Sequence, residues 1–269
     1  LESVTYQNTS ENPNTTNRTI SWLINDGSVA SSAVTTTISV TAVNDAPVLS
    51  GAGGTLAYTE NDGPKVIDAE LTITDVDDSN IESATITISS GFQLSEDVLS
   101  FTNANGITGS WNGSSGVLTL SGSATKAHYE SALESVTYQN TSENPNTTSR
   151  TISWQINDGL ANSSAVTSTI SLTSANDAPT SSGELTNTQA NEAGINSNGS
   201  VQAGVNASGS AAALMANITD VDGNSFTISQ GKKSTSGSFA NVPSFSTSTN
   251  GLTITGLYGS MQVGADGSY

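Results

Sequence analysis

The stretch RTISWQINDG, residues 150–159, alternates apolar and polar side chains and ends in turn residues. Ile152, Trp154 and Ile156 have the same parity, and the residues between them are polar. Because successive side chains of a β-strand point to opposite faces, this pattern predicts a strand with one buried and one solvated face. We therefore expect Trp154 in a hydrophobic core, with the sequence NDG forming the turn that follows.

This stretch belongs to a long repeat. Residues 1–47 return almost unchanged at 133–179, a spacing of 132 residues, and both copies contain LESVTYQNTSENPNTT, RTISW, INDG and NDAP. The period exceeds the roughly 20–50 residues of solenoid and propeller repeats and lies in the size range of an independently folding domain. Each repeat is therefore expected to be a module with its own core, and Trp22, the counterpart of Trp154, to lie in such a core.

The register of the repeat divides the chain into three modules. We expect the C-terminal part of one module at 1–44, a complete module at 45–176 and a truncated module at 177–269. The last three strands of a module, expected within 1–44, would by themselves expose their edges and an apolar face. Either the polypeptide continues before residue 1, or a neighbouring molecule completes that sandwich by donating strands.

Short alternating segments fill the complete module. Turn sequences such as NG at 105–106 and 112–113 separate stretches in which apolar residues alternate with polar ones, mostly Ser or Thr. These stretches are 66–74, 82–89, 97–102, 116–121, 134–140, 150–157 and 164–173. The pattern predicts an all-β fold, in which immunoglobulin-like Greek-key β-sandwiches follow one another in a linear array.

One segment breaks the alternation. The sequence SATKAHYESAL at 123–133 places Tyr129 and Leu133 four residues apart, on one face of a helix. Ser123 is a residue type that caps helix N-termini. We expect one short helix here, closing an end of the sandwich.

The composition excludes several classes of function. The formal charge is −18, from 24 acidic and 6 basic residues, which disfavours nucleic acid and anionic lipid as partners. The chain has no cysteine, so its modules cannot rely on disulfides, and no apolar run long enough for a membrane span. Cations are the more plausible partners of so acidic a chain.

Acidic residues follow two strands of the complete module. Asp75 and Asp77 come directly after LTIT, and Asp158, the counterpart of Asp26, follows SWQIN. Because consecutive strands of a sandwich reverse direction, these two loops share the end where the chain enters. They are therefore expected to converge on Asn44 and Asp45.

The same scheme recurs at the next boundary. Glu60 follows the first extended run and should lie at the opposite end of the module, and Glu192 lies 15 residues beyond Asp177 just as Glu60 lies 15 beyond Asp45. The candidate metal ligands are thus Asp26, Asn44, Asp45, Glu60, Asp75, Asp77, Asp158, Asn176, Asp177, Glu192, Asp220 and Asp222. About five oxygen-bearing side chains gather at each junction.

Calcium fits such a set of ligands best. Ca²⁺ takes six to eight oxygen ligands, whereas Mg²⁺ requires compact octahedral geometry and keeps its waters. Zinc or copper would require His or Cys, and the chain has one histidine and no cysteine. The plainer alternative is that acidic loops only keep the protein soluble.

No enzymatic chemistry is expected. His128 is the only histidine and lacks partners for a base-nucleophile pair or a zinc site. Trp111, in GSWNGSSG, lies outside the core pattern and could stack on a sugar, so a carbohydrate- or matrix-binding module is the alternative function. A tryptophan packed under a loop is the more common case.

The motifs NDAP, YTEND, ITDVDD and RTISWQINDG resemble those of cadherin-like modules in large bacterial surface adhesins, many of them RTX-type. The last region, from ITDVDG at 218–223 to GLYGSMQVGADGSY, resembles VCBS-type repeats, another immunoglobulin-like module of such adhesins. Cadherin linkers typically read DxNDxxP, and here Ala42 and Ser174 replace the leading Asp, which implies fewer ions per linker.

The resemblance implies an extender: modules in series, stiffened by calcium, that space a distal binding domain from a bacterial cell. It further implies an extracellular or cell-surface location. The partners implied are calcium and neighbouring modules of the same chain, with glycans or surface proteins contacted through other domains.

Overall fold

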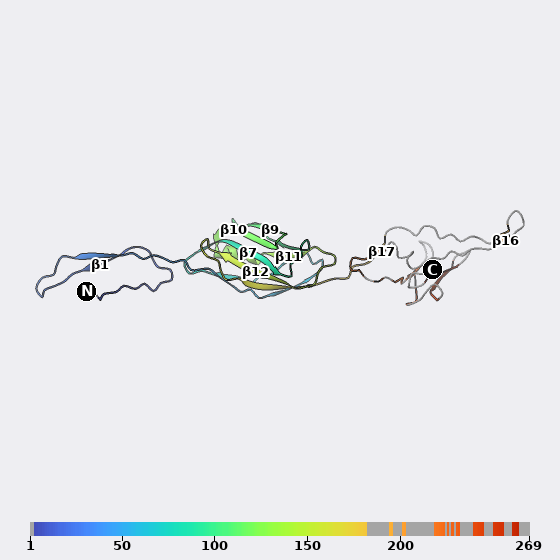
Figure 1. Cartoon of the computed structure of the whole chain (residues 1–269), viewed down its shortest axis with the longest axis horizontal. Helices are drawn as coiled ribbons and strands as arrows, with labels where there is room; N and C mark the ends of the chain where they lie inside the picture. Colours follow the sequence, from blue (N-terminus) through green and yellow to red (C-terminus); the bar gives the residue numbers. More distant parts are fainter. Residues whose placement is uncertain are drawn as a thin grey trace. The chain divides into compact units, whose positions relative to one another are not determined.

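The structure is a computed structural model that describes residues 3–181 continuously. Beyond them it describes 194–195, 201–202, 218–223, 225, 227–228, 230–231, 239–244, 250–255 and 260–263. The chain forms two compact units, Leu1–Ala175 and Asn176–Tyr269 (Figure 1). Each unit is described separately below.

The all-β prediction is confirmed. Eleven strands and one helix follow Pro47 in the first unit and constitute the complete module. Their bounds are β3 Val48–Ser50, β4 Thr55–Thr59, β5 Lys65–Val66, β6 Thr72–Thr74, β7 Asn80–Ser90, β8 Asp97–Ser100, β9 Thr108–Asn112, β10 Val117–Thr125, α1 Lys126–Glu134, β11 Thr137–Asn140, β12 Arg150–Asn157 and β13 Val166–Thr173.

The strands of this module form two main sheets and a short pair (Figure 1). The larger sheet has the order β4-β13-β12-β7-β10-β9, the smaller has the order β5-β11-β8, and β3 pairs with β6. All pairings are antiparallel except that of β13 with β4, which is parallel. The strands before and after the module's core therefore lie side by side and run in the same direction.

The core lies between the two main sheets. Trp154 and Ile86 of the larger sheet belong to the same buried cluster as Leu99 and Tyr138 of the smaller one. Trp154 is fully buried, as the alternation predicted, and its indole N–H donates to the hydroxyl of Ser168 at 3.0 Å. Each of these large side chains removes apolar surface from water, which stabilises the module by about 1.5–3 kcal/mol per side chain.

Local details differ from the expectations. The segment expected as one strand at 66–74 is divided into β5 and β6, and the helix is capped by the hydroxyl of Thr125 rather than by Ser123. Strand β9 was not expected, because TGSWN has a single large apolar residue. That residue, Trp111, is partly buried against the core cluster, so it lies on an edge strand rather than under a loop.

The first segment of the unit repeats only part of this arrangement. Strands β1 (Arg18–Trp22) and β2 (Val34–Ile38) pair antiparallel, and the indole N–H of Trp22 donates to Thr36, as that of Trp154 donates to Ser168. Residues 5–8, the counterparts of β11, are not a strand. Two strands are therefore present where three were expected.

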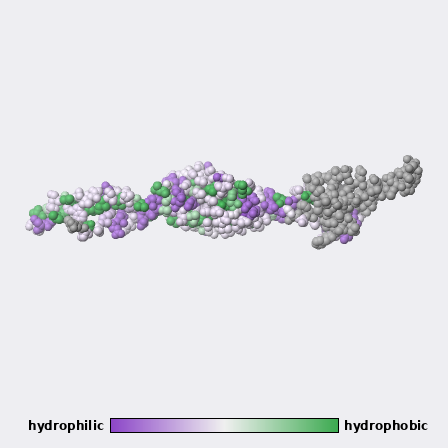
Figure 2. All heavy atoms as spheres, viewed as in Figure 1, coloured by the Kyte–Doolittle hydropathy of each residue, from purple (hydrophilic) through white to green (hydrophobic). Residues whose placement is uncertain are grey.

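The prediction that Trp22 lies in a core is wrong. Trp22 is only partly buried, and apolar side chains of this hairpin such as Ile24 and Val34 are exposed (Figure 2). In the complete module β7 pairs with β12 and its side chains cover Trp154, whereas in the described part of the chain β1 pairs with β2 alone. Identical sequence is therefore buried in one copy and exposed in the other.

The second unit contains short strands in the part that the structure describes. They pair antiparallel as β14 with β17, β15 with β16, β18 with β19 and β20 with β21. Their bounds are β14 Thr180–Ser181, β15 Gly194–Ile195, β16 Val201–Gln202, β17 Ile218–Thr219, β18 Gln230–Gly231, β19 Ala240–Asn241, β20 Leu252–Thr255 and β21 Ser260–Val263. All the described elements of this unit are strands.

Candidate acidic cation sites

The loop after β6 is shaped by its first aspartate. One carboxylate oxygen of Asp75, Oδ1, accepts the backbone N–H groups of Asp77 at 3.1 Å and Asp78 at 2.9 Å. This local turn holds the loop tightly against the end of the strand. The other oxygen of Asp75, Oδ2, is buried and has no hydrogen-bond donor.

The loop after β12 is built in the same way. The Oδ1 atom of Asp158 accepts the backbone N–H groups of Leu160 and Ala161, each at 2.7 Å. Its Oδ2 atom accepts the side-chain amide of Asn44 at 3.0 Å. Asp158 is therefore buried and fixed on both of its oxygens, and one of these contacts comes from the segment that enters the module.

The segment that enters the module also binds the first loop. The backbone N–H of Asp45 donates to Oδ2 of Asp77 at 3.1 Å, and Oδ1 of Asp77 is buried without a donor. From the preceding segment, the amide of Asn12 donates to the carbonyl of Val76 at 3.1 Å. Two loops and a linker thus meet at one end of the module.

Carboxylate oxygens of Asp75, Asp78 and Asp158 lie within 4.8 Å of one another. We call these three residues, together with Asn44, Asp45 and Asp77, the N-terminal acidic cluster. The expected convergence of Asp75, Asp77 and Asp158 on Asn44 and Asp45 is therefore present in the structure. That these residues hold a metal remains a prediction.

Mutual repulsion is visible in the electrostatics of this cluster. Burial and the negative charges of Asp75, Asp77 and Asp158 raise the pKa of Asp78, and the Lys126 ammonium opposes them only in part. Burial also pushes the pKa of Asp158 upward, but hydrogen bonds from Asn44 and the backbone outweigh it, so this pKa is lowered. An ionised cluster in this geometry is short of positive charge.

A cation that prefers oxygen ligands fits this set of side chains. Buried polar atoms in folded proteins nearly always have a hydrogen-bond partner. Two carboxylate oxygens of the cluster, Asp75 Oδ2 and Asp77 Oδ1, have none, although both are acceptors that carry charge. Carboxylate and amide oxygens are the ligands that calcium takes, so the donor set is appropriate for that ion.

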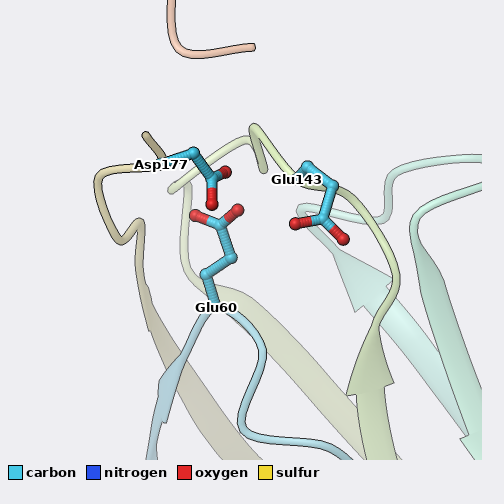
Figure 3. A group of neighbouring side chains, drawn as sticks. All are labelled: Glu60, Glu143 and Asp177. Atoms are coloured by element: carbon cyan, nitrogen blue, oxygen red, sulfur yellow. The ribbon is translucent and has the colours of Figure 1, made fainter. Parts of the chain in front are cut away.

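A second group lies at the other end of the module. Glu60, directly after β4, is 4% exposed, and its Oε2 atom accepts the backbone N–H of Ala175 at 2.8 Å. Its Oε1 atom is buried without a donor, and a carboxylate oxygen of Glu143 lies within 4.8 Å of a Glu60 oxygen. Figure 3 shows the two side chains side by side, and also labels Asp177 of the second unit.

Within the second unit the acidic residues repeat the contacts of the first. The backbone N–H of Asp177 donates to Oδ2 of Asp222 at 2.8 Å, as that of Asp45 donates to Asp77. The backbone N–H of Asp222 donates to Oδ1 of Asp220 at 2.9 Å, as that of Asp77 donates to Asp75. Asn176 donates from its side chain to the carbonyl of Asp177 at 2.7 Å.

Two candidate residues are not brought into a cluster. Asp26 is exposed and accepts the backbone N–H groups of Ser28 and Val29, which lower its pKa, and among the described residues it joins no group of acidic side chains. Glu192 lies outside the described residues. Asp26 thus keeps the loop conformation of Asp158 without its surroundings.

Two residues of these groups were missed in the sequence. Asp78 was recognisable as the third acid of the motif DVDD, but strand alternation gives only the end of the sandwich and not which loop atoms face inward. Glu143 belongs to the repeated sequence NTSENP, which carries no strand or helix pattern. Its duplication as Glu11 is the only sequence signal that could have singled it out.

Replacing Asp78 by Asn should stabilise the protein without calcium and weaken calcium binding. Because the pKa of Asp78 in the folded protein lies above that of the unfolded chain, stability is highest at low pH and falls as the pH rises through that pKa. The D78N variant lacks this loss, so its melting temperature in EGTA at pH 7 should exceed that of the unaltered protein. Its calcium affinity should be severalfold lower; a lower melting temperature in EGTA would contradict the assignment.

Comparison with known proteins gives a partial match. No family model matches the chain, and no solved structure matches it. Among the described residues, no helix has the length and apolar character required to cross a membrane. Over 109 residues, 39% of its length, the chain is 40% identical to halomucin of Haloquadratum walsbyi, and it spans only 1% of that protein.

Proposed function

We propose that this chain is a calcium-stiffened extender segment of a long extracellular surface protein. The observation that supports it most directly is the pair of buried carboxylate oxygens without donors, Asp75 Oδ2 and Asp77 Oδ1, in a cluster that joins two loops to the linker. A bound cation would supply the positive charge that this cluster lacks. It would also tie the linker to the module that follows.

The stiffening follows from electrostatics. Without a cation, the carboxylates of Asp75, Asp78 and Asp158 repel one another at short range, which loosens the loops that carry them. With calcium, these groups share one ion and the linker residues Asn44 and Asp45 are held with them. The joint then has fewer accessible conformations, and a series of such joints acts as a spacer.

We extend the proposal to the next boundary on the sequence repeat. Asn176 and Asp177 correspond to Asn44 and Asp45 at the spacing of 132 residues, and the ITDVD motif recurs with Asp220 and Asp222. Glu60, with its buried oxygen lacking a donor, is the candidate ligand that the first unit contributes, and Glu192 is the corresponding residue of the second.

The likeness to a stretch of halomucin supports the coarser part of this proposal, a protein at the cell surface or outside the cell. The resemblance of NDAP, ITDVDD and RTISWQINDG to cadherin-like modules supports the finer part, a spacer for a distal binding domain. The bacterial RTX-type adhesin and the VCBS-type third module rest on that resemblance alone.

Calcium titration calorimetry of residues 1–269 tests the proposal. The variant D75N/D77N removes two charges from the cluster, and E70Q/E134Q removes two charges from carboxylates that lie outside both clusters. We expect calcium binding in the unaltered protein and in E70Q/E134Q, and a loss of the tightest site in D75N/D77N. Binding should persist in 1 M NaCl, where exposed charges are screened within about 3 Å.

The solubility alternative gives the opposite result. If acidic side chains serve only to keep the protein hydrated, the two double variants should behave alike and salt should abolish whatever calcium uptake is seen. Equal calcium binding by D75N/D77N and E70Q/E134Q would therefore refute the site.

A further inference from the structure

Lys126, the first residue of α1, lies beside the N-terminal acidic cluster but bonds to its backbone. Its ammonium donates to the carbonyl of Asp75 at 2.8 Å and to that of Asp78 at 2.6 Å. Its own backbone N–H donates to the carbonyl of Ser79 at 3.3 Å. The helix therefore grips both ends of the loop 75–78.

A second side chain of the same helix extends this grip. Glu130, one turn after Lys126, accepts the backbone N–H of Ile73 at 2.7 Å, within strand β6. Residues four apart in a helix lie on the same face, so Lys126 and Glu130 act on one continuous segment from Ile73 to Ser79. The hydroxyl of Thr125 caps the helix and fixes its first turn, from which Lys126 projects.

These contacts decide which atoms of the loop remain available. The carbonyls of Asp75 and Asp78, which calcium often uses as ligands in other loops, are occupied by the ammonium. One oxygen of Asp75 is occupied by the turn that it forms. Asp75 Oδ2 and Asp77 Oδ1 are the buried oxygens left without donors, so the loop offers carboxylates rather than carbonyls to a cation.

We propose that Lys126 is a positioning residue, which holds the carbonyls of Asp75 and Asp78 so that the carboxylates of the loop face the cation. This inference rests on the proposed calcium site. It assigns to a lysine, whose charge repels calcium, a role that favours calcium binding. Anchoring residues outside the ligand set commonly change metal affinity by roughly 10–100-fold when removed.

The sign of the effect separates position from charge. Removal of a nearby positive charge alone should tighten calcium binding, because Lys126 repels the ion. Loss of the anchor should weaken it. We therefore expect K126M to bind calcium roughly tenfold more weakly, K126R to retain most of the affinity, and K65M, which removes the same charge from a lysine paired with Asp62, to bind as the unaltered protein does.

Hydrogen exchange of the calcium-free protein gives a readout that does not depend on the ion. The backbone N–H groups of Asp77 and Asp78 should exchange severalfold faster in K126M than in the unaltered protein, while those of β12 remain protected. Melting temperatures in EGTA verify that each variant is folded. Should K126M not fold, a K126R variant that loses calcium binding would overturn the proposal.

The outcomes distinguish this inference from the proposed function. Weaker calcium binding by K126M with rescue by K126R supports both. Equal or tighter binding by K126M, or unchanged exchange at Asp77 and Asp78, overturns the role of Lys126 alone. Absence of calcium binding in the unaltered protein overturns the proposed function and this role together.

Discussion

Removal of calcium with EGTA should lower the melting temperature of residues 1–269 by roughly 5–10 °C, since a ligand at a hundred times its Kd contributes about 2.7 kcal/mol and each kcal/mol shifts a protein of this size by about 2–4 °C. The physical reason is the loss of the only charge that offsets repulsion among Asp75, Asp78 and Asp158. Differential scanning fluorimetry in 5–10 mM Ca²⁺, on the order expected for weak extracellular sites, measures it.

Three controls make that result specific. The D75N/D77N variant should lose much of the calcium-dependent shift, the charge-matched E70Q/E134Q variant should keep it, and magnesium at the same concentration should give a smaller shift. Small-angle scattering on the same samples should show a shorter maximum dimension in EGTA, because the joints hinge. A melting temperature and a scattering profile that ignore EGTA would return the acidic residues to a role in solubility.

Replacing Arg150 by Ala should destabilise the complete module by about 3–5 kcal/mol, because removal of one partner leaves a buried charge unpaired. Arg150 is fully buried, and its guanidinium contacts Asp97 through Nε at 3.1 Å and Nη2 at 3.0 Å. Asp97 also accepts the hydroxyl of Tyr138 at 2.6 Å, and burial together with this contact raises the pKa of Tyr138. Urea unfolding followed by tryptophan fluorescence measures the loss.

The repeat supplies a matched control. Arg18 occupies the equivalent position of the first copy, is only partly buried and donates to the carbonyl of Thr16. It has no counterpart of Asp97 in the described residues, so R18A should change the free energy of unfolding by less than about 1 kcal/mol. Equal losses in R150A and R18A would show that the buried pair does not carry the effect.

Much of the module followed from the parity of its apolar residues. Trp154 and its neighbours are buried as alternation required, and the reversal of successive strands placed Asp75, Asp77 and Asp158 at one end. Strand β9 was missed because an edge strand needs little apolar surface. Gly109 within it lies so close to Phe101 that an added Cβ would approach the ring to 2.9 Å, a constraint that no periodicity records.

The remaining errors arise where partners decide. Trp22 and Trp154 share their local sequence, yet only the second has strand β7 beside its own strand, so burial is a property of tertiary pairing rather than of the segment. The roles of Glu143 and Lys126 depend on contacts across the fold, with residues 83 and up to 51 positions away. Such contacts are fixed by topology and leave no local pattern.

The parallel pairing of β4 with β13 has a mechanical consequence. Tension applied through the two ends of the module would pull these neighbouring strands in opposite directions along their length. Five paired positions, from Thr55 with Thr169 to Thr59 with Thr173, would then bear the load together in shear. An antiparallel terminal pair would open one hydrogen bond at a time, so this module is built to resist stretching.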